Sequence, residues 1–153
     1  MCNANVTSGF TLIELLVVVI IIGVLASISL PSLMRMVARA KEVEAKNNLS
    51  AIAFAQQGYR FEYRSFATSY ADLGLQPSGK YYDYFEPEAV PQGIISNAQP
   101  KSWGEGNARF YSMGVYVNNE AFILFLCESK DELTTTKAPE SFDGACAEEG
   151  KRL

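Results

Sequence analysis

The sequence predicts an α+β protein in which one long N-terminal helix packs on a small antiparallel sheet. Three observations support this class: a 20-residue block without charge from Leu15 to Met34, a run of helix-forming residues after Pro31, and two apolar segments late in the chain that flank a short turn. Packing a helix on a sheet buries the apolar faces of both. The 153 residues suit one domain of this kind.

The charge-free block is long enough to cross a membrane. At about 1.5 Å per residue, a helix of this length covers roughly 30 Å, the thickness of a bilayer's hydrocarbon core. Its β-branched run Val17–Ile22 would also suit a buried strand, but strands rarely exceed about 10 residues. We therefore expect a membrane-spanning helix.

Three kinds of N-terminal segment fit such a block: a secretory signal, a plain membrane anchor and a processed signal-anchor. A secretory signal has a positive start, and residues 1–9 contain no Lys or Arg, although Ala26 and Ser27 would allow cleavage. A plain anchor has no use for Glu14, because a carboxylate at a helix centre costs about 2.5–3.5 kcal/mol on insertion. The processed signal-anchor accounts for this residue.

The segment Gly9-Phe10-Thr11-Leu12-Ile13-Glu14, followed by the apolar run, resembles the class III signal of the type IV pilin family, which pilins share with the pseudopilins of secretion and DNA-uptake machines. The resemblance implies that a prepilin peptidase cuts after Gly9 and methylates Phe10. It further implies that Glu14 pairs with a neighbouring subunit's N-terminus during assembly, and that Gly23 and Pro31 loosen the helix.

The motif covers about residues 9–45, and the resemblance beyond it is architectural. It implies a leader over residues 1–9, a hydrophobic transmembrane and assembly helix over 10–34, and a globular head over 35–153. It also implies a single-pass inner-membrane protein with its C-terminus outside, which then enters an extracellular fibre. The positive-inside rule alone favours the opposite orientation, since Arg35, Arg39 and Lys41 follow the span.

The second half of the helix has an apolar stripe suited to covering a sheet. Its members recur at steps of four and three residues: Ala45, Leu49, Ile52, Gln56 and Tyr59. Residues 59–75 read as a connection to the sheet, in which Thr68 or Ser69 caps a short helical turn.

Strands are predicted with unequal clarity in the rest of the chain. Residues 76–106 hold four of the six prolines, which predicts loops and short strands, with Tyr81–Phe85 and Gly93–Ser96 as candidates. Phe110–Val117 and Ala121–Cys127 predict a hairpin around Asn119. The sheet should have three or four strands. The aromatic cluster Tyr81, Tyr82, Tyr84 and Phe85 suits core packing, or else an adhesive patch.

Cleavage after Gly9 would remove Cys2 and leave Cys127 and Cys146 as an even pair. We expect these two to form a disulfide that closes a loop of about 20 residues and contributes on the order of 3 kcal/mol. Such a loop resembles the C-terminal disulfide region that pilins expose on the fibre. Two unpaired buried thiols are the alternative.

Catalysis and nucleic-acid binding find little support. The chain has no His, which removes the commonest general base, and its net charge of −4 comes without an obvious basic patch. Asp131, Glu132 and Asp143 could supply oxygens to calcium, but their spacing matches no metal loop. We expect no catalytic residue, no cofactor and no metal.

The resemblance implies the precursor of a structural subunit of a type IV pilus, used for adhesion, motility or DNA uptake. The alternative is a pseudopilin or minor pilin of a type II secretion or competence machine, and a third is a membrane-anchored binding domain or enzyme. The implied partners are identical or homologous pilin subunits, the prepilin peptidase, the pilus assembly machinery and, before assembly, the membrane.

Overall fold

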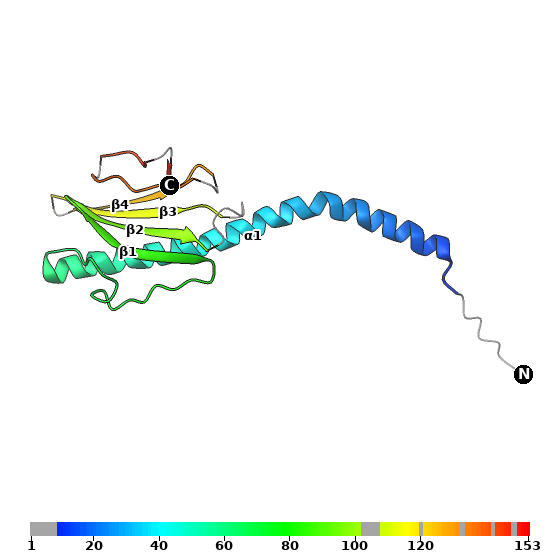
Figure 1. Ribbon diagram of the computed structural model, residues 1–153, viewed down its shortest axis with the longest axis horizontal. Coiled ribbons are helices and arrows are strands. Elements are labelled where there is room, and N and C mark those ends of the chain that lie inside the picture. Colours follow the sequence, from blue (N-terminus) through cyan, green and yellow to red (C-terminus); the bar gives the residue numbers. More distant parts are fainter. Residues whose placement is uncertain (1–8, 102–107, 120, 132–133, 142, 148–149) are drawn as a thin grey trace, which may run out of the picture. The chain divides into compact units, whose positions relative to one another are not determined.

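The structure, a computed structural model, describes residues 9–101, 108–119, 121–131, 134–141, 143–147 and 150–153. Helix α1 (Leu12–Tyr63) precedes four strands that Figure 1 labels, β1 (Tyr82–Val90), β2 (Gly93–Pro100), β3 (Tyr111–Asn118) and β4 (Ala121–Glu128). A two-residue strand, β5 (Lys151–Arg152), ends the chain order. Neighbouring strands are antiparallel and follow chain order, β1-β2-β3-β4-β5. The predicted α+β class is confirmed, and the sheet has five strands instead of three or four.

Helix α1 contains 52 residues and continues through both Gly23 and Pro31. Backbone contacts divide the chain after Val37 into two units, of which the second is Ala38–Leu153. The helix runs out of the first unit into the second.

In the second unit, one stripe of α1 is buried against the sheet. Four members of the predicted stripe are buried: Ala45, Leu49, Ile52 and Gln56. The adjacent Ala53 is buried as well. Tyr59, the fifth, is only half-buried and stacks on Tyr63, with ring centroids 4.4 Å apart. The buried stripe therefore ends at Gln56.

Gln56 also holds the segment that follows the helix. Its side-chain amide donates to the carbonyl oxygen of Ala67 at 2.7 Å, and its side-chain oxygen accepts from the N–H of Ala67 at 3.0 Å. Further on, Ser69 Oγ accepts from the N–H of Asp72 at 3.2 Å, the bond expected of a residue that caps a short turn.

The two strand candidates of residues 76–106 are present, because Tyr81–Phe85 overlaps β1 and Gly93–Ser96 lies in β2, but both strands are longer than expected. Strand β1 has nine residues and β2 has eight. Pro87 lies in an edge strand, and the pairing register shifts between Phe85 and Glu88, so no ladder bond requires its missing N–H. Pro91 lies in the turn between the two strands. Pro87 and Pro91 therefore mark a bulge and a turn.

The hairpin of β3 and β4 is confirmed. Pairing extends from Tyr111 opposite Glu128 to Asn118 opposite Ala121. Asn119 follows with a φ of +47°, in the left-handed region that Asn tolerates. Strand β5 extends the sheet beyond β4 by pairing with Cys127 and Glu128.

Side chains alternate along each strand, and each face of the sheet carries a buried apolar cluster. The face toward α1 contributes Ala98, Tyr111 and Met113 to the larger apolar cluster. The other face carries a smaller cluster of Ile95, Cys127 and Ala138. Of the predicted aromatic cluster, Tyr82 is fully buried in the larger apolar cluster and Tyr81 and Tyr84 are half-buried against it, whereas Phe85 is 48% exposed.

Candidate functional site

Helix α1 begins at a capping box formed by Thr11 and Glu14. The Glu14 carboxylate accepts hydrogen bonds from the N–H of Thr11 at 2.8 Å and from its hydroxyl at 2.7 Å. In return, Thr11 Oγ1 accepts from the N–H of Glu14 at 3.3 Å. The two side chains thus satisfy N–H groups that a helix leaves unbonded in its first turn.

The capping role of Glu14 was not predicted, although the sequence contains its signal. Thr-x-x-Glu directly before an apolar run is the capping-box pattern. The pattern explains why the helix begins at Leu12 and gives Glu14 a local structural role in addition to the expected one. The structure places Gly9 and Phe10, the expected processing residues, just before this box.

The first half of α1 has no partner among the described residues. Every described residue from Gly9 to Val37 is exposed, and the large apolar side chains range from 44% exposure at Val18 to 83% at Leu12. An apolar surface of this extent marks a membrane or protein interface. By length and composition, α1 is the one helix in the described part of the chain that could cross a membrane.

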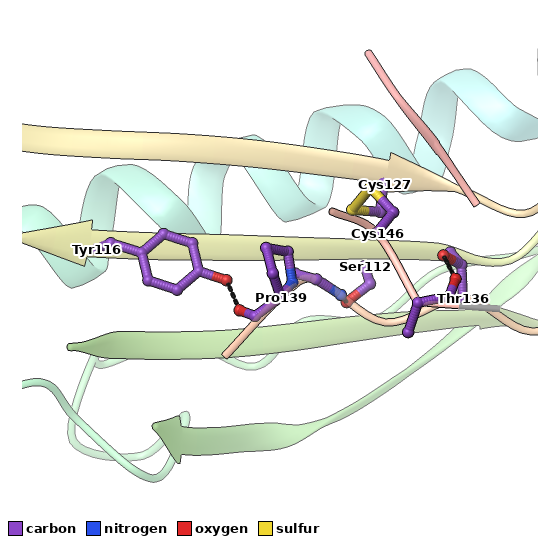
Figure 2. The surroundings of a disulfide bond; sticks show 8 residues. Ser112, Tyr116, Cys127, Thr136, Pro139 and Cys146 are labelled. Atoms are coloured by element: carbon purple, nitrogen blue, oxygen red, sulfur yellow. Dashed lines mark hydrogen bonds between the residues drawn. A yellow bond between two sulfur atoms is a disulfide. The ribbon is translucent and has the colours of Figure 1, made fainter. Parts of the chain in front are cut away.

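The C-terminal region lies on the face of the sheet opposite α1. Cys127 at the end of β4 and Cys146 form a disulfide with a Cα–Cα distance of 5.8 Å, drawn in Figure 2. The segment that precedes Cys146 lies against β3. There the N–H of Ala138 donates to Ser112 Oγ at 2.8 Å. The disulfide therefore closes a segment that is also bonded directly to the sheet.

Further bonds hold the same segment. Lys137 Nζ lies 2.7 Å from Glu88 Oε1 of β1, and the N–H of Ala147 donates to the carbonyl oxygen of Lys137 at 3.0 Å. Thr136 Oγ1 donates to the carbonyl oxygen of Ala147 at 3.0 Å. The order of this region consequently does not depend on the disulfide alone.

Tyr116 of β3 also bonds to this segment. Its hydroxyl donates to the carbonyl oxygen of Pro139, as Figure 2 shows. The ring lies over Gly114, where an added Cβ would overlap ring atoms. Its centroid is 5.5 Å from the ring centroid of Phe125. Burial raises the pKa of Tyr116, so the hydroxyl remains a donor at neutral pH.

Two of the three carboxylates considered as calcium ligands, Asp131 and Asp143, are engaged in local hydrogen bonds. Asp131 Oδ1 accepts from the N–H of Thr134 at 2.9 Å, and the hydrogen bond from Ser141 lowers the pKa of Asp143. Glu132 lies outside the described residues. Among the residues that the structure describes, no group of three His, Cys, Asp or Glu side chains could hold a metal ion.

A helix-on-sheet head preceded by an exposed apolar helix with a processing motif is the architecture of type IV pilin-like proteins. The chain belongs to this group: the family model "Type IV pilin-like G and H" matches residues 42–147. A model of the prokaryotic N-terminal methylation motif matches residues 5–30.

The relatives include fibre and secretion proteins. The chain is 40% identical over 91 residues to the type IV major pilin protein PilA of Myxococcus xanthus, which covers 59% of this chain and 41% of PilA. It is 37% identical over 98 residues to the type II secretion system core protein G of Pseudomonas aeruginosa, over 64% of this chain and 59% of that protein. It is 44% identical over 112 residues to the fimbrial protein EcpC of Eikenella corrodens, over 65% of this chain and 67% of that protein. The chain thus spans less than two thirds of the length of PilA and of the Pseudomonas protein.

Proposed function

We propose that this chain is the precursor of a type IV pilus subunit, which polymerises through the first half of α1 into an extracellular fibre. The observation that carries the proposal is the continuous exposure of the apolar side chains from Phe10 to Val37. In the membrane these side chains contact lipid, and in a fibre they contact other subunits. The methylation motif and the relatives PilA and EcpC support this assignment.

Processing would create the charge that assembly uses. Cleavage after Gly9 leaves a cationic amine on Phe10, four residues before Glu14. At about 4 Å and an effective dielectric constant near 20, an amine and a carboxylate attract by roughly 4 kcal/mol. This energy is comparable with the cost of about 2.5–3.5 kcal/mol for a carboxylate inside a bilayer. Pairing between subunits thereby offsets the cost of burying Glu14.

The flexible positions act at a later stage, in the assembled fibre. Gly23 lacks a side chain, and Pro31 lacks the N–H that would bond within α1. Membrane helices tolerate both because neighbouring helices supply other contacts. The segment between them can therefore unwind when subunits pack or a fibre is stretched.

The second candidate is a pseudopilin of a type II secretion machine or a minor pilin. Relatives named type II secretion system core protein G favour the pseudopilin, and they include the Pseudomonas protein at 37% identity. Such a subunit would assemble by the same helix but in a short structure within the cell envelope. Neither candidate requires a catalytic residue or a cofactor.

The two candidates differ in where the polymer is found. Fibres sheared from the cell surface are purified and their dominant subunit is identified by mass spectrometry, with a strain that carries Glu14→Ala as the matched control. A pilus subunit dominates fibres from the wild type and is missing from those of the control. Fibres without this chain, together with a secretion defect in a deletion strain, would favour the pseudopilin.

A further inference from the structure

Two lysine ammonium groups converge on the ring of Tyr81 at the start of the sheet. Lys41 Nζ of α1 lies 5.4 Å from the ring centroid, and Lys80 Nζ lies 5.2 Å from it. Neither ammonium forms an ion pair with a carboxylate of the described residues. We call Lys41, Lys80 and Tyr81 the Tyr81 cluster. It combines an amphipathic ring with two ammonium groups that form no ion pair within the described part of the chain.

The backbone around the cluster is held in place by Glu44. Its carboxylate accepts hydrogen bonds from the N–H groups of three consecutive residues, Lys80 at 3.0 Å, Tyr81 at 3.0 Å and Tyr82 at 3.2 Å. Three such bonds satisfy much of the carboxylate's capacity to accept. A Cβ at Gly79 would overlap Glu44 Oε1, so a glycine permits this close approach. Glu44 thus fixes the cluster and directs its carboxylate to the backbone.

A third lysine borders the cluster but is already occupied. Lys101 Nζ donates to the carbonyl oxygen of Gly79 at 2.8 Å and lies 3.6 Å from Asp83 Oδ1. Its main-chain N–H donates to the carbonyl oxygen of Tyr81 at 2.9 Å. These bonds stabilise the surface on which Lys41 and Lys80 are presented. Of the three lysines around Tyr81, Lys41 and Lys80 are therefore the two whose ammonium groups remain available to an external anion.

We propose that the Tyr81 cluster docks on the anionic phospholipid headgroups beside the membrane span before the subunit is assembled. Lys41 follows Met34, the last residue of the charge-free block, by seven positions, about 10 Å of helix at 1.5 Å per residue. The headgroup region is roughly 5–7 Å thick on each side of the hydrocarbon core. The lysine stem reaches back across the remaining distance.

The chemistry of the cluster and the charge of the chain both favour this partner. Lysines near an anionic surface are attracted to it, and tyrosine is enriched at membrane interfaces. The chain as a whole carries a net charge of −4, so an anionic surface repels most of the head. The side that bears the cluster is the one drawn toward the headgroups. The inference rests on the membrane-anchoring part of the proposed function and adds a bound position for the head.

The test uses the full chain in lipid vesicles. Its single tryptophan, Trp103, is changed to Phe, and Tyr81→Trp provides the fluorescent reporter. The vesicles contain phosphatidylcholine alone or a mixture with phosphatidylglycerol. We expect a blue shift and quenching by a headgroup-level spin label in the mixed vesicles only. Both should be reversed at about 1 M salt, where the Debye length falls to about 3 Å.

Charge-matched variants assign the effect. Lys41→Gln with Lys80→Gln should reduce the salt-sensitive signal, by about fivefold in the docked-to-undocked ratio for each lysine. Lys137→Gln with Lys151→Gln removes the same charge from the C-terminal region and should leave the signal unchanged. An equal loss in both double variants would overturn the inference.

Two further outcomes separate this inference from the anchoring itself. Flotation of the vesicles after a high-salt wash reports insertion of the span. If the chain floats but its reporter fluorescence does not change with phosphatidylglycerol, the docking is overturned and the anchoring stands. A chain that does not float would contradict both. A blue shift in phosphatidylcholine that grows with the protein-to-lipid ratio would identify a second copy as the partner and overturn lipid docking.

Discussion

The carboxylate of Glu14 accepts hydrogen bonds from both the N–H and the hydroxyl of Thr11, at 2.8 and 2.7 Å. The residue expected to carry intersubunit charge therefore also caps its own helix. The two roles are compatible, because a carboxylate has about four acceptor positions and Thr11 uses two of them. The box also holds the carboxylate near the start of the helix, where the amine of Phe10 would be created.

The dual role of Glu14 can be separated by substitution. Glu14→Gln keeps a side chain that can cap and removes the charge, whereas Glu14→Ala removes both. Membrane insertion should persist in each variant, since removing a carboxylate lowers the insertion cost. Fibre yield, measured by shearing and quantification, should fall strongly in both. Thr11→Val is the control: it weakens the cap by about 1 kcal/mol and should leave fibres near the wild-type level. Normal fibres from Glu14→Gln would contradict the charge-pairing role.

Processing should yield a chain that starts at Phe10 and contains 144 of the 153 residues. The reason is the Gly9-Phe10 junction directly before the capping box. Intact-mass and N-terminal analysis of protein taken from fibres would show this start and a methylated amine. A chain that retains Met1, or one that starts near Ser27, would rule out the processed signal-anchor.

Loss of the Cys127–Cys146 disulfide should loosen the C-terminal region before the rest of the fold. Closing a loop with a sequence separation of 19 contributes about 2–4 kcal/mol. The bonds of Ala138 to Ser112 and of Tyr116 to Pro139 should keep the segment partly docked. Cys127→Ser with Cys146→Ser should therefore lower the free energy of unfolding by that amount and raise hydrogen exchange mainly after residue 134. Uniform exchange across the sheet would contradict this expectation.

The same disulfide reports the side of the membrane that the head occupies, because a reducing cytoplasm keeps thiols apart. Peptide mapping of unreduced protein, with thiols blocked during lysis, should recover one cross-linked pair. Free thiols at both positions in intact cells would count against the outward orientation.

Gly114→Ala should destabilise the head by about 1–3 kcal/mol, the usual cost of forcing extra volume into a packed site. A Cβ there would overlap the Tyr116 ring, which would have to leave its bond to Pro139. Gly58→Ala is the matched control, since a Cβ at this helical position meets nothing within 4 Å. It should stabilise the helix by about 0.5–1 kcal/mol. Chemical denaturation of both variants measures the difference, and equal effects would refute the packing argument.

The head should unfold at alkaline pH through its buried tyrosines. Burial raises the pKa of Tyr70 to about 12 and raises the pKa values of Tyr82, Tyr111 and Tyr116 as well. Because the folded-state values lie above the ordinary value of 10, these groups contribute stability that is complete below pH 10 and is lost as the pH rises through the folded values. Tyrosinate absorbance and circular dichroism should therefore change together above pH 10. Ionisation of these tyrosines without unfolding would contradict their burial.

Local pattern in the sequence was sufficient for several elements. The apolar block predicts the first half of α1, and the stripe from Ala45 to Tyr59 predicts, as far as Gln56, the face that packs on the sheet. Asn119 between two apolar segments predicts the hairpin. In each case the signal lies within a few residues of the structure it specifies, as periodicity or as turn chemistry.

Neighbouring residues were thus sufficient to predict the helix, its buried stripe, the hairpin and the processing motif. Other features depend on partners far along the chain. In the proline-rich segment, β2 is held by pairing with the distant β3, and β1 in turn pairs with β2. Glu44 fixes the Tyr81 cluster across 37 positions, and Tyr116 reaches Pro139 across 23. Such contacts leave no periodic signal in the sequence, because each depends on where folding brings two distant segments together.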